Sequence, residues 1–326
     1  MSPFAKLSRD RFLVVGRGGM DIYPDPPGVR TEDAVRFFAA LGGSAANIAV
    51  AVTRLGGSAS LVSPVSDDAV GRYVVNQLDR YGVDRRHVTF VGGQVRTSLA
   101  VVESRIEDHQ SVIYRNGAAD FELTVADVEN LDYRDYGALI TTGTVFASEP
   151  SRSAGFCALE RARSAGLPLV FDIDHRPYSW PSAEIACEIY SRVGRSCDFV
   201  VGNDDEFGFM AGDYSRGLDM ARELGRNTSG AIVYKMGERG AITLAGDREI
   251  RTGIYPVTAL KPTGAGDAFM GGFMSSLANG RDLEAAVLRG SACAAIVVSK
   301  VACAPAMPDM ATLEEFLSAH DGPVQL

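Results

Sequence analysis

Short apolar runs alternate with amphipathic segments along almost the whole chain, and this alternation limits the possible fold more than any other feature. The apolar runs have the length of buried strands: 12–16, 59–65, 138–142, 168–174, 198–202 and 231–236. The segments between them place apolar residues at helical spacing: 44–55, 68–81, 151–165, 182–194 and 215–224. Such repeated alternation is typical of an α/β fold, with a doubly wound, mostly parallel sheet flanked by helices.

Two regions interrupt this repeat. Residues 20–41 and 95–121 lack helical periodicity and contain short alternating segments, so we expect them to leave the sheet and form a small β lid. Beyond residue 236 the pattern predicts a hairpin and then two long helices: 240–245, 249–255, 266–279 and 283–300. No linker or low-complexity tract divides the chain. We therefore predict a single domain over 1–326, with the lid segments inserted in it.

Charge and cysteine content narrow the class of protein. The chain has 32 basic and 41 acidic side chains, a formal net charge of −9. A nucleic-acid or anionic-membrane binder needs a basic face, so we expect neither kind of partner. The apolar stretches are shorter than the roughly 20 residues of a membrane-spanning helix. The five cysteines form no C-x-x-C pair, which suggests reduced thiols and a cytoplasmic protein.

The segment 261–269 carries the strongest chemical signal, because a glycine-rich turn opens a helical pattern there. Gly264, Ala265 and Gly266 leave their backbone N–H groups open to close approach. At a helix N-terminus these donors favour an anion such as phosphate, and Asp267 beside it could accept a proton from an attacking hydroxyl. On spacing alone, an aspartate that only favours a helix start fits equally well.

Other phosphate-binding signatures are absent from the sequence. No lysine follows a glycine, which excludes a Walker A loop, and there is no His-Arg-Asp motif of a protein kinase. The segment 16–21 resembles a dinucleotide fingerprint, but Asp21 stands in the place of the third glycine and no helical pattern follows. We therefore reject a dinucleotide site there.

Four motifs in the right order resemble the ribokinase-like (PfkB-type) carbohydrate kinases over nearly the whole length. They are Leu41–Asn47, Asn203–Glu206, Lys235–Gly240 and Thr263–Asp267. The resemblance implies an ATP-dependent sugar kinase with Mg²⁺ as cofactor, whose small-molecule partners are a sugar and ATP. It also implies lid closure over the sugar, and in some relatives the lid joins two subunits, so a homodimer through the lid is an open possibility.

The resemblance further implies a role for individual residues. Asp267 is the expected catalytic base, and the turn before it is the expected anion hole: Gly264, Ala265 and Gly266. Four residues are expected at the nucleotide: Lys235, Gly237, Gly240 and Asn203. Asn203 and Glu206 are expected to position Mg²⁺ through water, although a turn residue and a surface carboxylate before a helix would look the same. Three residues are expected to bind substrate hydroxyls: Asp21, Gly43 and Asn47.

One position departs from the family pattern. Many relatives carry an aspartate before the glycine turn that helps to bind an activating monovalent cation, whereas this chain has Lys261 followed by Pro262. A fixed ammonium could take the place of the cation, which predicts catalysis without K⁺. A solvated lysine at a strand end is the alternative.

Two arginines suggest an acidic sugar. Arg176 follows a predicted strand at the sheet edge where α/β folds bind ligands, and Arg115 belongs to the lid. A guanidinium pairs with a carboxylate in a planar, bidentate way. Each arginine could instead form a structural salt bridge.

The segment 172–180, taken with 15–21 and 261–267, is similar to one branch of the family. That branch phosphorylates the 6-hydroxyl of 5-dehydro-2-deoxy-D-gluconate (2-deoxy-5-keto-D-gluconate) in myo-inositol catabolism. A kinase of 2-keto-3-deoxygluconate, or of another sugar, is the alternative within the family. A catalytically silent relative that only binds a sugar acid is the alternative outside enzymes, although it would not need the base Asp267.

Overall fold

The large sheet of the protein is built from nine strands. The computed structural model describes residues 4, 7, 10–320 and 322–324. The strand order is β13-β12-β11-β10-β9-β8-β1-β4-β5, parallel from β5 to β11 and antiparallel over the last two. The strands are β1 (Arg11–Val15), β4 (Ser58–Ser66), β5 (Asp84–Val91), β8 (Ala138–Thr142), β9 (Leu169–Asp172), β10 (Phe199–Asn203), β11 (Ala231–Lys235), β12 (Ala241–Ala245) and β13 (Arg248–Thr252). The predicted doubly wound sheet is confirmed.

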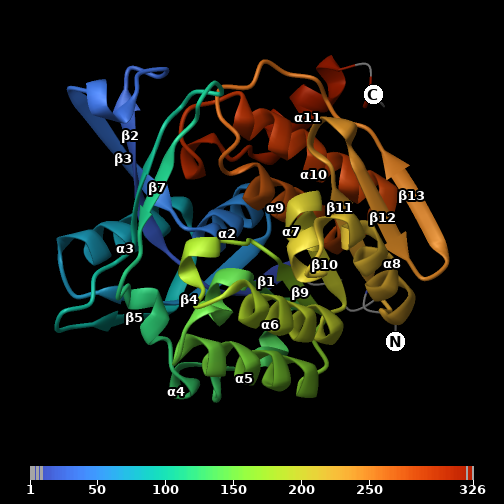
Figure 1. Cartoon of the computed structure of the whole chain (residues 1–326), viewed down its shortest axis with the longest axis horizontal. Coiled ribbons are helices and arrows are strands. Elements are labelled where there is room, and N and C mark those ends of the chain that lie inside the picture. Colours follow the sequence, from blue (N-terminus) through green and yellow to red (C-terminus); the bar gives the residue numbers. More distant parts are fainter. Residues whose placement is uncertain (1–3, 5–6, 8–9, 321, 325–326) are drawn as a thin grey trace.

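Helices cover both faces of this sheet (Figure 1). One core packs the sheet against α2 (Ser44–Arg54), α3 (Ala69–Tyr81), α9 (Ala265–Ala278), α10 (Leu283–Val298) and α11 (Met310–Ala319). A second core on the opposite face involves α4 (Val125–Val128), α5 (Ser151–Ser164), α6 (Ala183–Ser196), α7 (Asp204–Met210) and α8 (Gly217–Asn227). Strands enclosed in this way are apolar on both sides, which explains why they read as continuous apolar runs.

A second, four-stranded sheet projects from one side of the molecule (Figure 1). Its order is β3-β2-β6-β7, formed by β2 (Gly19–Asp25), β3 (Arg36–Gly42), β6 (Leu99–Val102) and β7 (Ser111–Tyr114). Each predicted lid segment supplies two of these strands. The predicted β lid is therefore confirmed.

The parallel strands of the large sheet all end on the same side, which is called the sheet edge here. The loops after β1, β8, β9, β10 and β11 therefore meet at this carboxyl-terminal edge. Helices α2 and α9 pack against each other, and a hydrogen bond between Asn47 and Asp267 joins their first turns. None of the described helices is both long and apolar enough to span a bilayer.

Candidate active site

The glycine turn before α9 has a backbone that other residues could not adopt without strain. Gly264 is the N-cap of α9 at φ +86°, and a Cβ atom there would lie 2.8 Å from Cys303 Sγ. A Cβ at Gly266 would lie 3.5 Å from Lys235 Nζ, so the ammonium at the end of β11 stands beside the helix N-terminus. Backbone N–H donors, the helix dipole and a lysine thus converge on one spot, which suits a phosphate group.

Asp267 lies in the first turn of α9. Its Oδ2 accepts a hydrogen bond of 2.8 Å from Asn47 Nδ2. Burial, supported by the charge of Asp174, raises the pKa of Asp267 to about 7, while the Asn47 hydrogen bond and the charge of Arg176 act in the opposite direction. A carboxylate with this pKa is suited to general base catalysis near neutral pH.

Lys261 is completely buried, with an exposed fraction of 0%. Its Nζ donates to two backbone carbonyl oxygens, Thr263 O at 2.6 Å and Val297 O at 3.3 Å. Burial lowers the pKa of the ammonium, and the nearby Cys303 and Asp267 oppose that shift. The alternative of a solvated lysine is therefore wrong.

Asn203 and Glu206 form a reciprocal cap at the start of α7. Asn203 Oδ1 accepts from Glu206 N at 2.8 Å, and Glu206 Oε2 accepts from Asn203 N at 2.8 Å. Glu206 Oε1 accepts a third bond of 3.2 Å from His175 N, so each carboxylate oxygen holds one protein donor. Within the residues that the structure describes, no group of three or more His, Cys, Asp and Glu side chains is placed to hold a metal directly.

The loop after β11 is a short 3₁₀ turn between two glycines at positive φ. Gly237 is at +58° with open space around it, and Gly240 is at +82°. A Cβ at Gly240 would lie 2.0 Å from Thr252 O in β13, so only glycine fits. The turn therefore presents backbone rather than side chains.

Asp21 and Gly43 lie where the lid joins the sheet. Asp21, on β2, is only 4% exposed and accepts a hydrogen bond of 3.0 Å from Tyr23 Oη. Burial raises the pKa of Asp21, and the charge of Arg17 opposes it. Gly43 caps α2 at φ +93°, where a Cβ would approach Arg17 O to 2.4 Å.

Both predicted substrate arginines have an internal carboxylate partner. Arg115 is 5% exposed, its Nε donates to Asp120 Oδ2 at 3.0 Å, and its Nη2 bonds Asp120 and Thr144 O. Its Nη1 is enclosed without a partner. Arg176 Nη2 pairs with Asp174 Oδ1 at 2.7 Å, and its Nη1 donates to His175 O. The structure thus places Arg176 within electrostatic reach of Asp267, and it binds each of the two guanidinium groups to an aspartate.

Two buried charged residues at the same edge were not singled out from the sequence. Asp172 ends β9 and is 4% exposed; burial raises the pKa of Asp172 well above its usual value, and Lys235 opposes it. Arg17 follows β1 and is 7% exposed, with Nη1 donating to Ser98 Oγ at 3.1 Å. Arg17 lies in the segment 15–21, which contributed to the resemblance to one branch of the family, but no role was predicted for its side chain.

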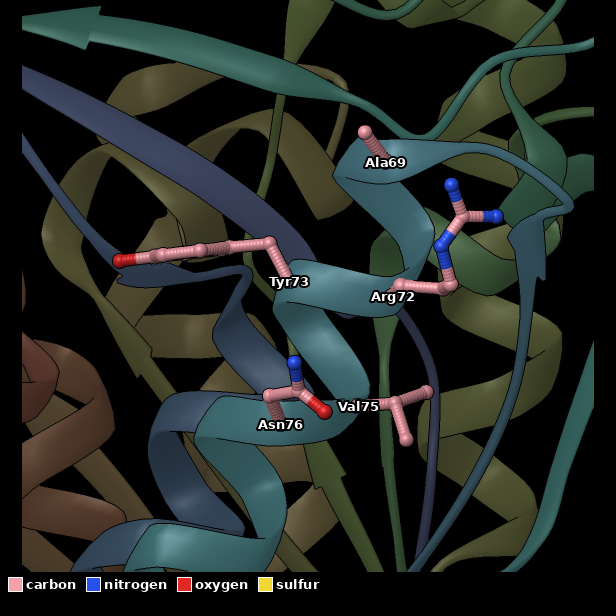
Figure 2. A pocket seen from close by; sticks show the side chains of 5 residues that line it. All are labelled: Ala69, Arg72, Tyr73, Val75 and Asn76. Atoms are coloured by element: carbon pink, nitrogen blue, oxygen red, sulfur yellow. The ribbon is translucent and has the colours of Figure 1, made fainter.

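An open pocket of about 380 Å³ lies against α3 (Figure 2). Its lining residues are Ala69, Arg72, Tyr73, Val75 and Asn76. None of the residues predicted to act on sugar or nucleotide lines this pocket. The candidate active site is therefore defined by the side chains at the carboxyl-terminal edge of the large sheet and not by this pocket.

Comparisons with known proteins agree with this geometry. The family model described as pfkB family carbohydrate kinase matches residues 10–310. A 5-dehydro-2-deoxygluconokinase of Photobacterium profundum is 37% identical, covering 97% of this chain and 98% of that protein. One of Geobacillus kaustophilus is 35% identical, covering 98% and 96%. A solved fructokinase double mutant of Vibrio cholerae O395, in a form with fructose, ADP and potassium bound, is 25% identical with a TM-score of 0.83, covering 94% and 98%.

Proposed function

Because the chain belongs to the pfkB family of carbohydrate kinases, we propose that it transfers phosphate from ATP to the 6-hydroxyl of 5-dehydro-2-deoxy-D-gluconate. The observation that carries this proposal is the full-length likeness to proteins named 5-dehydro-2-deoxygluconokinase, at up to 37% identity. Arg17, which is 7% exposed and forms no ion pair among the described residues, adds physical support, because an acidic sugar needs a cation near its carboxylate.

The test is an ADP-release assay with Mg-ATP and four sugars at equal concentration. The sugars are 5-dehydro-2-deoxy-D-gluconate, 2-keto-3-deoxygluconate, fructose and ribose. A clear preference for the first supports the proposal, and a preference for the second keeps the chemistry but changes the substrate. Activity on fructose or ribose alone means that Arg115 and Arg176 are structural and do not bind an acidic substrate. Binding of the first sugar without turnover would favour a silent sugar-acid-binding protein.

In the proposed mechanism Asp267 accepts the proton of the 6-hydroxyl while the oxygen attacks the γ-phosphorus of ATP. The hydrogen bond from Asn47 orients the carboxylate. The N–H groups of Gly264, Ala265 and Gly266 stabilise the charge that develops on the transferred phosphoryl group, and Lys235 beside Gly266 adds a positive charge. We propose that Asp21, Gly43 and Asn47 bind and orient the sugar hydroxyls.

The nucleotide is proposed to lie along the loops after β10 and β11. The turn at Gly237 and Gly240 offers backbone without side-chain obstruction, and Lys235 stands between this turn and α9. We propose that Asn203 and Glu206 would hold Mg²⁺ through bridging water molecules. Each Glu206 oxygen already holds a backbone donor but keeps a lone pair for a water molecule. Mg²⁺ bound to ATP would neutralise phosphate charge.

We propose that Lys261 replaces a monovalent cation in this site. The solved fructokinase of Vibrio cholerae O395 contains potassium, whereas here an ammonium without solvent exposure bonds the carbonyls of Thr263 and Val297. Activity should be the same in K⁺ as in tetramethylammonium at constant ionic strength. Activation by K⁺ of many-fold would contradict this proposal.

A homodimer through the lid is also proposed. Strands β3 and β7 are the two edges of the lid sheet, and large apolar side chains are exposed on them or directly before β3: Val35, Phe37, Phe38, Val112 and Tyr114. The register places Phe37, Val112 and Tyr114 on the same face of the sheet, and exposed apolar side chains on one face suit an interaction surface. Sedimentation should give a dimer for the natural chain and a monomer for Phe37→Asp with Val112→Asp. A monomer for the natural chain would contradict it.

We further propose that residues 1–326 form one domain of a cytoplasmic enzyme. All five cysteines are free, as a reducing compartment requires. A single transition in urea, with fluorescence and circular dichroism changing together, would support one domain, and separate transitions would contradict it.

A further inference from the structure

We propose that Arg17 binds the carboxylate of the sugar acid and is the main determinant of acid specificity. This inference rests on the proposed function, because it assumes an acidic substrate at the edge of the large sheet. It differs from the expectation drawn from sequence, which assigned that role to Arg115 and Arg176. The reason is the difference between the partners of the three guanidinium groups.

Arg115 and Arg176 are each neutralised by an aspartate, while Arg17 is not. Arg115 holds Asp120, and Arg176 holds Asp174 at 2.7 Å. Among the ion pairs of the described residues none includes Arg17, although its side chain is only 7% exposed. Carboxylates lie within electrostatic reach of Arg17, but none of the described ones bonds its N–H groups, and a buried guanidinium gains most when a carboxylate bonds it directly.

The free part of the Arg17 guanidinium has the shape that a carboxylate needs. Nη1 is held by Ser98 Oγ at 3.1 Å. Nε and Nη2 have no acceptor among the described residues and are not among the fully enclosed polar atoms. These two atoms form one edge of the planar group, and their parallel N–H bonds match the two oxygens of a carboxylate. Ser98 therefore fixes the plane and leaves the binding edge open.

The position of Arg17 also fits the proposed reaction. It follows β1 where the lid begins, and Ser98 directly precedes lid strand β6. Its positive charge acts on Asp21, Asp174 and Asp267, where in each case it lowers the pKa. Arg17 thus lies within electrostatic reach of the proposed base and of the proposed hydroxyl ligand. A carboxylate entering this acidic environment needs such a cation.

The backbone at Arg17 supports the same placement. Its carbonyl oxygen accepts from Ala46 N at 3.2 Å, and a Cβ at Gly43 would come within 2.4 Å of it. A Cβ at Gly19 would lie 3.3 Å from Arg17 Nη1. Two glycines therefore leave room for both the backbone and the guanidinium.

The experiment compares two substrates in matched variants. The substrates are 5-dehydro-2-deoxy-D-gluconate and its neutral analogue with a hydroxymethyl group in place of the carboxylate. For Arg17→Gln we expect kcat/KM for the acid to fall by about 10²–10³-fold, with most of the change in KM, and for the analogue by less than about fivefold. Arg17→Lys keeps the charge but loses the bidentate geometry, and its ratio of acid to analogue should fall by about tenfold.

Arg72→Gln is the control, because Arg72 lies on the outside of α3 with a side-chain exposure of 60%. Its ratio of kcat/KM for acid and analogue should equal that of the natural chain. A natural ratio in Arg17→Gln overturns the inference. If that variant does not fold, a natural ratio in Arg17→Lys overturns it equally. Should the unmodified enzyme fail to phosphorylate the acid, the proposed function fails instead, which is a separate result.

Discussion

The phosphoryl side and the sugar side of this site are built in different ways. At the N-terminus of α9 the proposed anion hole is backbone from three consecutive residues, with the proposed base next to them in the chain. On the sugar side the proposed groups are side chains from three separate segments: Arg17 after β1, Asp21 on β2 and Asn47 on α2. A site formed by consecutive backbone groups produces a local sequence motif, so it can be predicted from the sequence. A site formed by side chains that are far apart in the chain produces no such motif.

The largest effect is expected from Asp267→Asn, which tests the phosphoryl side alone. Loss of a general base costs about 10²–10⁴-fold, so kcat should fall by that factor while KM changes modestly. Steady-state kinetics with Mg-ATP measure this. Asp219→Asn is the control, because Asp219 lies on α8 with a side-chain exposure of 72% and has no proposed role in the site. Activity near that of the natural enzyme in Asp267→Asn would remove this residue from the mechanism.

Arg115→Met tests whether the lid arginine belongs to the sugar side or to the framework. Removing it leaves Asp120 buried without its partner, which should lower the free energy of unfolding by about 3–5 kcal/mol. Urea denaturation measures this. Arg85→Met breaks an exposed ion pair with Asp79 and should cost no more than about 1 kcal/mol. Equal losses in the two variants would mean that the Arg115–Asp120 pair is not structural.

The fold was largely predictable because its strands are buried on both faces. The ends of β8, Ala138–Thr142, agree with the prediction, and β1 and β11 agree within one residue at each end. Strand β5, Asp84–Val91, and helix α11 were not predicted. β5 is the outermost strand on one side of the sheet, none of its residues is fully buried, and it begins with charged residues. Its sequence therefore shows neither an apolar run nor a regular alternation of apolar and polar residues.

The site was predictable only where a local pattern encodes it. The turn at Gly264 lies at a helix start, and positive φ explains its composition. The bond between Asn47 and Asp267 joins residues 220 positions apart, and no local pattern contains it. Arg17 lay in a segment rejected as a dinucleotide motif, and nothing near it in sequence indicates that its side chain reaches Ser98.

Gly264→Ala tests whether the backbone conformation before α9 requires glycine. A Cβ costs roughly 1–2 kcal/mol at positive φ, and the clash with Cys303 should add about 1–3 kcal/mol to the loss of unfolding free energy. Gly237→Ala shares the positive φ but meets open space, so it should show only the first loss. Equal unfolding free energies of the two variants would show that Cys303 yields without cost.

The pH dependence of kcat/KM tests the charge on the phosphoryl side. Asp267 must be ionised to accept a proton, and burial raises its pKa to about 7, so kcat/KM should fall about tenfold for each pH unit below 7. Asn47→Ala removes a hydrogen bond that lowers this pKa, so the fall should begin at a higher pH. Asn76→Ala, at an exposed position of helix α3, should keep the original profile. A flat profile between about pH 5.5 and 8 would assign the base elsewhere.

The smallest effect is expected in the lid, where hydrogen exchange compares the mobility of the sugar side with that of the phosphoryl side. Residues 98–103 and 111–115 include the lid strands β6 and β7, and β7 is an edge strand with exposed side chains. Substrate beneath the lid should draw these strands toward the sheet and slow their amide hydrogen exchange by a few-fold, because closure excludes water from the reacting groups. The amides of buried helix α9 should exchange at the same rate with and without sugar, since its first turn is already held by Asn47. Unchanged exchange in both lid segments at saturating sugar would mean that the sugar side is as rigid as the phosphoryl side.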